Sequence, residues 1–499
     1  MYKSGFILFV VCLFLGCQEI PEQKQISAKT VPVLQPLQGG ALTWHTWAER
    51  DSARILNKPI LLFLYNQRSF WCRDLAQRCF NHLELVQEIT RIAWPVWVDV
   101  DRQPDIFERF SLGGLPAIAF LKPNGEWISG GTYFDPEDLL DLLRHVSFPF
   151  ANPERMVALE EQRGELQRRK RLWAQKHPRP QIAPSKVLLE RMLDSLDVAI
   201  TRGIDVGAEG VMALFEARQK THGIQPWLQM RRDTDGAFFL YAHTLDGKVV
   251  DREKHLGINA SILTALATVG QTDDAMGLAG VALGDALLRS FWVDGLFCAG
   301  FAAFETAGGV PRDLAVYSGW NALTVSGFAA LYHFNKAPRF QEAAVLTIDA
   351  IQNKFENKAG LFDHAAGETG RLLLQDQAFM ARAALDVYDV TGEDKYLQLA
   401  RGLVDGMLAS FGDVSGALRD RNIKDDPIFN VGDHWLPSGN GVAAQVFVRL
   451  HKLTGDNKYQ DVARRLLTAL IGPHIDEAQS MGALCRALNM YLALDGRVP

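Results

Sequence analysis

Apolar residues follow three different patterns along this chain of 499 residues. Residues 6–15 form one almost unbroken apolar run. Between residues 58 and 148, short apolar runs alternate with amphipathic stretches, which is typical of strands and helices in turn. Beyond residue 186, strand signals become sparse and apolar residues recur at helical spacing. The patterns predict an export segment, an α/β domain and an all-α domain, and the length also favours more than one core.

The α/β region has a motif at its first strand-to-helix turn. Strands are expected at 58–65, 93–100, 117–121 and 127–130, with a closing helix at 136–146. Ser69-Phe-Trp-Cys72 follows the first strand, and Pro116 precedes the third. This order resembles the thioredoxin fold, in which that proline is cis and faces the active-site turn. The region is therefore expected to form a central sheet covered by helices.

The helical region contains an internal repeat. Residues 385–396, with Thr-Gly-Glu-Asp-Lys-Tyr, are echoed by residues 448–459, with Thr-Gly-Asp-Asn-Lys-Tyr, and looser copies lie at 330–340 and 265–276. The period of roughly 60 residues fits two helices with loops per repeat. We expect five to six such units over the region. No polar capping repeat ends the chain, so a closed (α/α)6 toroid is favoured over an open solenoid.

These patterns divide the chain into five parts. The tether is rich in Pro, Gln and Lys, and the linker is rich in charged residues on a long helix. The expected parts are a lipoprotein signal peptide at 1–17, a flexible tether at 18–42, a thioredoxin-like domain at 43–148, a charged helical linker at 149–185 and the toroid at 186–499.

The first apolar run is too short to span a bilayer as a helix, so it indicates a removable signal peptide. It ends in Leu15-Gly16-Cys17, which resembles a bacterial lipobox. Cys17 is then the lipidated N-terminus, and the chain is anchored to the bacterial envelope and faces the periplasm. The alternative is an ordinary signal peptide with an incidental cysteine.

The net charge and the remaining cysteines exclude several classes of function. A formal net charge of -6 gives no basic field for a nucleic acid. Cys72, Cys79, Cys298 and Cys485 are scattered, so they form neither a disulfide framework nor a zinc site. We expect no metal and no cofactor.

The thioredoxin-like motif lacks one of the two cysteines of a dithiol site. Ser69 holds the exposed position at the helix N-terminus, where a cysteine becomes nucleophilic. Cys79 lies about 10 Å from Cys72 if both are on one helix, which is too far for a disulfide. Dithiol exchange is therefore not expected, and Cys72 is either a monothiol or a small buried hydrophobe.

The same region resembles the thioredoxin-like domain of the spermatogenesis-associated family, a group of two-domain proteins. The family pattern Cys-His-Trp-Cys-His reads Ser69-Phe-Trp-Cys-Arg73 in this chain. The resemblance implies a divergent, bacterial lipoprotein member whose C-terminal domain is a six-hairpin glycosidase-like toroid. The matching positions are Trp44, Trp47-Ala48, Lys58-Pro59-Ile60, Trp71-Cys72, Phe80, Val100-Asp101-Arg102, Pro104-Asp105-Ile106, Gly113-Gly114, Pro116, Leu121-Lys122-Pro123 and Gly130–Phe134.

The resemblance continues through the helical region in the same order. It is carried by Arg252–Ala260, Ser318–Leu323, Leu374–Ala378 and Asp433 with Pro437–Asn440. It is weak at 197–240, where the family's Gly-Gly-Phe-Gly segment has no clear counterpart. The family's Asp-Asn pair has become Ile258-Asn259.

A funnel of inner helices that binds a sugar needs aromatic faces for stacking and carboxylates for hydroxyls or proton transfer. The catalytic candidates are Glu253, Asp376 and Asp433. A carboxylate separation near 5 Å allows retaining hydrolysis, and about 6.5 to 9.5 Å allows inverting hydrolysis. Asp376 and Asn440 also suit a capping role at helix starts, and Trp320 suits the core. The candidate substrate-binding residues are Tyr241, Lys254, Asn259, Trp320, Asn321, Trp435, Ser438 and Asn440.

Three hypotheses follow. The favoured one is a periplasm-facing protein whose toroid binds or processes a saccharide, with the thioredoxin-like domain in a structural or docking role. The second is a monothiol redox protein that uses Cys72, with Ser69 and Pro116 beside it. The third is a non-catalytic interaction protein of an envelope assembly. Polar groups and aromatics around an open cavity favour the first, whereas a toroid centre plugged by apolar side chains argues against an enzyme.

Overall fold

The computed structural model describes residues 31–110, 112–152, 154, 168, 181–242, 250–423, 428–433 and 435–494. The predicted signal peptide, Cys17 and most of the predicted linker lie outside these residues. No helix in the described ranges is long and apolar enough to cross a bilayer.

The N-terminal domain is a four-stranded sheet with helices on both faces, as expected. The strands lie in the order β2-β1-β3-β4, with β1 parallel to β2 and the other pairs antiparallel. The bond between Leu115 and Pro116 is cis. The elements are η1 (Trp47–Arg50), α1 (Asp51–Ile55), β1 (Ile60–Tyr65), α2 (Phe70–Cys79), α3 (Leu83–Ile92), β2 (Trp94–Asp99), α4 (Pro104–Phe110), β3 (Ala117–Leu121), β4 (Trp127–Gly131) and α5 (Pro136–Ala151).

Strand β1 is the centre of this domain because every one of its residues is buried. Successive side chains of a strand point to opposite faces of the sheet. Leu61 and Phe63 therefore pack under α2, α3 and α5, while Leu62 and Leu64 pack with the residues of α4 on the other face. A continuous apolar run thus gives a strand that is covered on both sides.

Residues 33–42 pack against both domains, which corrects the expectation of a flexible tether for this part of 18–42. Leu34 donates its backbone N–H to the carbonyl of Arg312, and Ala41 donates to that of Phe80. Leu37 is buried, with 4% of its surface exposed. The segment is therefore part of the folded structure.

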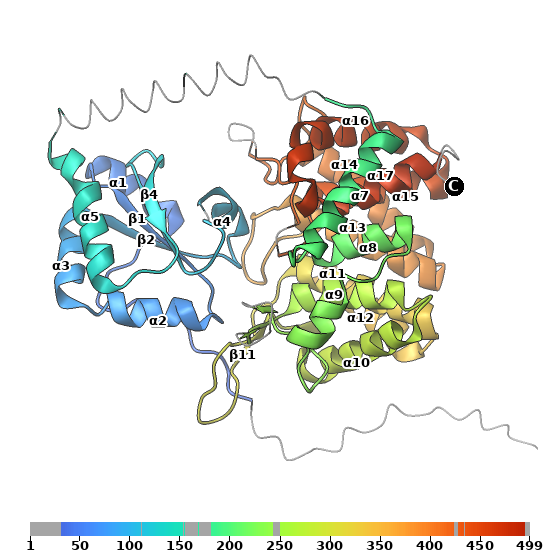
Figure 1. Ribbon diagram of the computed structural model, residues 1–499, viewed down its shortest axis with the longest axis horizontal. Helices are drawn as coiled ribbons and strands as arrows, with labels where there is room; N and C mark the ends of the chain where they lie inside the picture. The colour runs from blue at the N-terminus through green and yellow to red at the C-terminus, as the bar shows by residue number, and fades with distance from the viewer. Residues whose placement is uncertain are drawn as a thin grey trace, which may run out of the picture.

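The C-terminal domain is a closed ring of helices, which confirms the predicted all-α toroid (Figure 1). Each inner helix packs against the next, and α8 closes the ring against α9. The inner helices are α8 (Gly207–Arg218), α9 (Leu256–Val269), α11 (Ser318–Asn335), α13 (Leu374–Thr391), α15 (Gly439–Thr454) and α17 (Gly482–Leu494). The outer helices are α7 (Lys186–Thr201), α10 (Asp274–Ser290), α12 (Pro338–Phe355), α14 (Asp394–Phe411) and α16 (Asn457–His474).

The ring departs from a regular set of six hairpins between α8 and α9. There the described chain forms the short π-helix η2 (Trp227–Arg231) where an outer helix is expected. The same stretch lies within residues 197–240, the weakest part of the family resemblance. The short strands of the toroid are β5 (Tyr241–Ala242), β6 (Val250–Asp251), β7 (Lys254–His255), β8 (Trp292–Val293), β9 (Leu296–Phe297), β10 (Gly300–Phe301) and β11 (Arg312–Asp313), and η3 (Ile475–Ser480) precedes α17.

A buried ionic network crosses the centre of the ring. The Glu209 carboxylate on α8 accepts hydrogen bonds from Arg382 on α13, at 2.6 Å, and from Arg486 on α17, at 2.7 Å. Burial opposes the charge of Glu209, but the two arginines outweigh it and lower its pKa to about 2. The network thus joins the inner helices α8, α13 and α17.

Helix α4 of the thioredoxin-like domain faces the toroid (Figure 1). Its residues contact the segments that lead into α13 and α15: Asp105 is bound by Arg371, and the ring of Phe107 lies 5.9 Å from that of Trp435. The thioredoxin-like domain, called the cap from here on, therefore covers one end of the ring.

Candidate functional site

The thioredoxin-like turn holds a buried thiol. Ser69 is the N-cap of α2, and its hydroxyl oxygen accepts a hydrogen bond from the N–H of Cys72 at 3.3 Å. Cys72 has no exposed surface, and burial raises the pKa of its thiol to about 12. Cys79, Cys298 and Cys485 are also buried and unpaired. At neutral pH the Cys72 thiol is therefore protonated and shielded.

The toroid covers this turn. Ala303, in the loop after β10, donates its N–H to the carbonyl of Arg68 at 3.0 Å. The guanidinium of Arg73 lies 5.0 Å from the centre of the Phe304 ring and also donates to the carbonyl of Gln67. Ser69 is only 5% exposed. Part of the edge that carries the active site in a thioredoxin is thus an internal interface in this chain, while Phe70 and Trp71 of the same turn stay exposed.

Arg68 joins the two domains. Its guanidinium is fully buried and contacts Asp101 of the cap at 2.8 Å, together with Glu253 at 2.9 Å and Asp313 at 2.8 Å from the toroid. Burial opposes the charge, but the three carboxylates hold the pKa of Arg68 well above its usual value. Asn66 donates to Glu253 as well. One cation therefore binds carboxylates of both domains.

Carboxylates outnumber cations in this cluster. Burial raises the pKa of Asp99 and of Asp101, and the neighbouring carboxylates add to the effect while Arg68 opposes it. Protons shared among these groups reduce the excess of negative charge.

The structure removes all three predicted catalytic carboxylates from open space. Glu253 is fully buried against Arg68. Asp376 binds His364 at 2.9 Å. Asp433 accepts hydrogen bonds from the N–H groups of Ser438, at 2.8 Å, and Ala483, at 2.7 Å. None of the three lines a cavity described below. Their positions argue against the catalytic prediction, because all three carboxylates are bound by partners within the protein, although the second oxygen of Asp376 has no hydrogen-bond partner among the described residues.

His364 connects the Asp376 carboxylate to the cap. One ring nitrogen faces Asp376, and the other lies 2.7 Å from the backbone carbonyl of Asp101. Burial lowers the pKa of His364, but Asp376 and the carbonyl outweigh it, so the pKa is raised. Both neighbours accept hydrogen bonds, which the protonated ring satisfies.

Three of the predicted substrate-binding residues use their side-chain amides to form hydrogen bonds with the backbone instead. Asn321 accepts from the N–H of Phe297 at 2.7 Å and donates to the carbonyls of Phe297 and Tyr317. Asn259 makes the same contacts with Phe238 and His255, and Asn440 makes them with Leu418 and Asn430.

Gln377 repeats this arrangement at Phe362 and Leu373. We call this four-fold feature the amide clamp. Since both amide hydrogens are used, we withdraw Asn259, Asn321 and Asn440 as saccharide ligands.

Two further predicted substrate-binding residues, Lys254 and Ser438, already have partners within the protein. Lys254 forms ion pairs with Asp233 and Asp235, and the Ser438 hydroxyl accepts from the N–H of Gly441 at the start of α15. Tyr241 lies in β5, and its side chain is outside the described part of the structure. These observations leave Trp320 and Trp435 from the predicted set.

Trp320 and Trp435 both line a cavity between the cap and the ring. It has a volume of about 70 Å³, room for a few water molecules. His255 lies against Trp320, with ring centres 3.9 Å apart, and burial together with nearby Arg68 lowers its pKa. The lining residues are Val100, Asp101, Pro104, Phe107, Glu108, His255, Trp320, His364, Gln375, Asn430, Trp435, Leu436 and Pro437.

A larger cavity of about 330 Å³ lies on the other side of Trp435. Its volume is at the lower end of the range for small-molecule sites. The cap contributes Gly113 and Gly114, and the toroid contributes Asp205, Gly207, Ala208, Trp227, Leu240, Ile258, Ser261, Ile262 and Trp435. Because Trp435 lines both cavities, we refer to the two together as the interdomain cavity.

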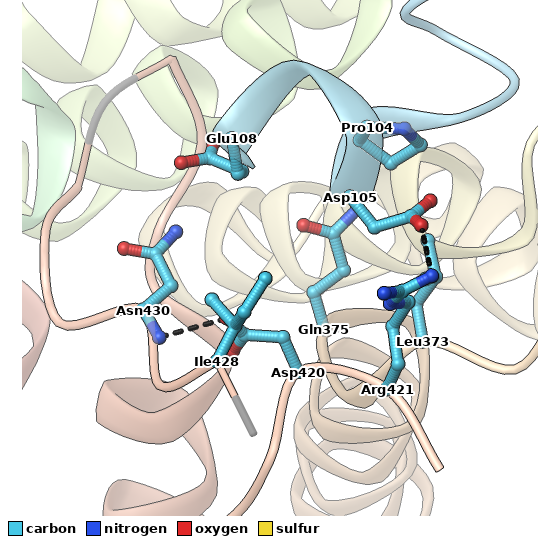
Figure 2. A pocket seen from close by; sticks show the side chains of 10 residues that line it. Pro104, Asp105, Glu108, Leu373, Gln375, Asp420, Arg421, Ile428 and Asn430 are labelled. Atoms are coloured by element: carbon cyan, nitrogen blue, oxygen red, sulfur yellow. Dashed lines mark hydrogen bonds and ion pairs between the residues drawn. The ribbon is translucent and has the colours of Figure 1, made fainter. Parts of the chain in front are cut away.

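A small polar recess of about 30 Å³ adjoins the interdomain cavity and shares Pro104, Glu108, Gln375 and Asn430 with it (Figure 2). Figure 2 shows Gln375 reaching from α13 toward α4, which carries Glu108. Asp420 accepts from the N–H of Asn430 at 2.8 Å, and burial raises its pKa to about 8.

Sequence reasoning missed the cap residues Phe107 and Glu108 and the toroid residues His364 and Gln375. Gln375 stands beside the predicted Asp376 in the same matched segment, so that motif was a usable signal. No spacing in the sequence indicates that α4 meets the ring. Among the described residues, no group of three or more His, Cys, Asp or Glu side chains is arranged to hold a metal ion.

Fold and site define the chain as a two-domain protein, with a thioredoxin-like domain followed by an α/α toroid. Residues 23–168 match the family model Thioredox_DsbH, described as a protein of unknown function, DUF255. Spermatogenesis-associated protein 20 of Homo sapiens is 32% identical over 105 residues, which are 19% of this chain and 13% of the relative. The chain thus spans well under two thirds of the length of that relative.

Two other similar proteins carry names that refer to sugars. Mannosyl-oligosaccharide 1,2-alpha-mannosidase MNS1 of Arabidopsis thaliana is 23% identical over 160 residues, which are 31% of this chain and 26% of the relative. The solved structure of cellobiose 2-epimerase from Bacillus thermoamylovorans B4167 has a TM-score of 0.45 and 13% identity, and the match covers 52% of this chain and 73% of that one.

Proposed function

We propose that the interdomain cavity binds a saccharide and that the cap is a structural part of the toroid rather than a dithiol oxidoreductase. The observation that carries the proposal is the lining of the cavity: three tryptophans, Trp227, Trp320 and Trp435, line it, and amide and carboxyl side chains border it. Sugar rings stack on aromatic faces while their hydroxyls bind such polar groups. The segment shared with a mannosidase supports the same class of ligand.

The geometry around Cys72 supports a structural role for the cap. A reactive cysteine needs a lowered pKa and access to its partner, and Cys72 has neither. The turn also contributes Arg68 to the interface. Arg68, Ser69 and Cys72 are therefore closed to substrate proteins.

The test is a thermal-shift screen of the full chain in detergent with neutral hexoses, hexosamines, their N-acetyl derivatives, disaccharides and hexuronic acids at millimolar concentration. A ligand that binds the folded state raises its melting temperature. We expect at least one saccharide to do so, and Trp435→Ala to lose about ten-fold in affinity for it. Trp71→Ala, at an exposed tryptophan away from the cavity, is the matched control. A complete absence of shifts overturns the proposal.

We also propose that the chain is exported and lipid-anchored through Cys17. The sequence of residues 6–17 supports this, with an apolar run that ends at Gly16-Cys17. In a bacterial host, a palmitate analogue should label the chain and Cys17→Ser should remove the label. Label that persists in Cys17→Ser, or a wild-type chain that remains unlabelled, contradicts lipidation.

A further inference from the structure

Both domains line the interdomain cavity, so the cap can contact whatever binds there. Phe107 of α4 packs beside Trp435 in its wall, with ring centres 5.9 Å apart. Glu108, the next residue, stands at its rim and is exposed. The backbone of Gly113 and Gly114 forms another part of the wall. A ligand beside Trp435 therefore touches the cap as well as the ring.

Gln375 gives the cavity an available hydrogen-bonding group. Its amide lines both the interdomain cavity and the polar recess, and it has no hydrogen-bond partner among the residues that the structure describes. The neighbouring Gln377 is fully engaged in an amide clamp, so α13 offers one amide to the backbone and one to the cavity. An amide can both donate to and accept from a sugar hydroxyl.

The charges around the cavity disfavour an acidic ligand. Two groups that carry or can carry a positive charge line the cavity or its recess, and each is matched within the protein: Arg421 of the recess binds Asp105, and His364 of the cavity binds Asp376. The third such group, His255, is held neutral because burial lowers its pKa. A carboxylate placed there would lose hydration without gaining a cation.

The starts of the inner helices give no compensation. A helix N-terminus favours a negative charge, and several inner helices begin at the cavity. Protein side chains already occupy the starts that line the cavity: Asp205 accepts from the N–H of Gly207 before α8, Asp376 lies in the first turn of α13, and the neutral ring of His255 accepts from the N–H of Ile258 at the start of α9.

From these contacts we infer that the cap forms part of the ligand site, with Phe107 and Glu108 as contact residues near Gln375 and Trp435. The site selects neutral or amino saccharides and rejects acidic ones. The inference rests on the proposed function. Phe107 provides an apolar wall for a sugar ring, and Glu108 accepts a hydrogen bond from a hydroxyl or an ammonium group.

The experiment is calorimetric titration of the full chain in detergent, with the hexose or hexosamine that gives the largest thermal shift and with the matching hexuronic acid. We expect the uronic acid to bind at least ten-fold more weakly. Phe107→Ala and Glu108→Gln should each weaken binding of the preferred sugar about ten-fold. Phe148→Ala and Glu137→Gln, at exposed positions of α5 in the same domain, serve as controls.

The outcomes separate this inference from the proposed function. If Trp435→Ala abolishes binding while Phe107→Ala and Glu108→Gln bind as the wild type does, the cap is no part of the site and the inference fails, although the proposed function stands. Equal or tighter binding of the uronic acid overturns the selectivity. A protein that binds no sugar at all fails the proposed function first. Unchanged circular dichroism and melting temperature in each variant show that it has folded.

Discussion

Cys72 lies on the buried side of α2, below the N-cap that Ser69 provides. A thiol reacts as its thiolate, so burial that raises the pKa to about 12 leaves almost no reactive form at neutral pH. At the residue scale, the absence of the first cysteine of the motif and the burial of the second both argue against thiol chemistry at this turn.

Cys72 should therefore react with an aromatic disulfide reagent at pH 7 at least a hundred-fold more slowly in the folded chain than in guanidinium chloride. Cys72→Ala serves as the control that assigns the reaction to this thiol. Rapid labelling of Cys72 in the folded chain would restore the monothiol hypothesis.

Asp420 should make stability depend on pH. Its pKa is about 8 in the folded chain and about 4 in the unfolded chain, so the folded state binds the proton more tightly. The stabilisation is complete below pH 4 and is lost as pH rises toward 8. Asp420→Asn does not titrate at this position, so its unfolding free energy should rise relative to that of the wild type by roughly 3–4 kcal/mol between pH 5 and pH 8.

Urea unfolding at both pH values measures this difference. Asp138→Asn, at an exposed site on α5, is the control and should show the same difference from the wild type at both pH values. A constant difference between Asp420→Asn and the wild type would contradict the raised pKa.

At the element scale, the helical period predicted the toroid and the alternation of strands and helices predicted the cap, because both patterns are local and repeat many times. The sequence shows the amide-clamp residues as polar residues at the starts of inner helices. It does not show which groups their side chains contact. The sequence shows an Asn at position 321; only the fold shows that Phe297 of strand β9 lies beside it. Candidate ligands and structural amides therefore looked alike.

Asn321→Ala tests the clamp. The change leaves the N–H and the carbonyl of Phe297 without their partner in a buried position, which should lower the unfolding free energy by about 2–4 kcal/mol. Asn353→Ala, on the exposed face of α12, should change it by no more than about 0.5 kcal/mol. Denaturant unfolding compares the two, and equal effects would refute the clamp.

At the scale of the whole molecule, the contacts that build the site join residues far apart in the chain, such as Arg68 and Glu253. Neither residue has a local pattern that indicates the other, so Glu253 was taken for a catalytic acid. For the same reason, the contact between α4 and the ring could not be predicted, because the sequence of this short helix gives no sign of it. The sequence thus predicted the two domains and two aromatic residues of the cavity, but not the interface between them.

Arg68→Met should loosen this interface. It leaves Glu253 and Asp101 buried without their cation, which typically lowers the unfolding free energy by about 3–5 kcal/mol. Arg54→Met, at an exposed position of α1, should be near neutral. Chemical denaturation of both variants at pH 7 gives the comparison, and a neutral Arg68→Met would show that the ion cluster does not hold the domains.

The central claim is that one saccharide site is shared by the cap and the toroid. Hydrogen exchange of the full chain, measured with and without the sugar that raises its melting temperature, tests it most directly. We expect slower exchange both in α4 (Pro104–Phe110) and at the start of α13 near Gln375. Protection in the toroid alone, with α4 unchanged at saturating sugar, would contradict it.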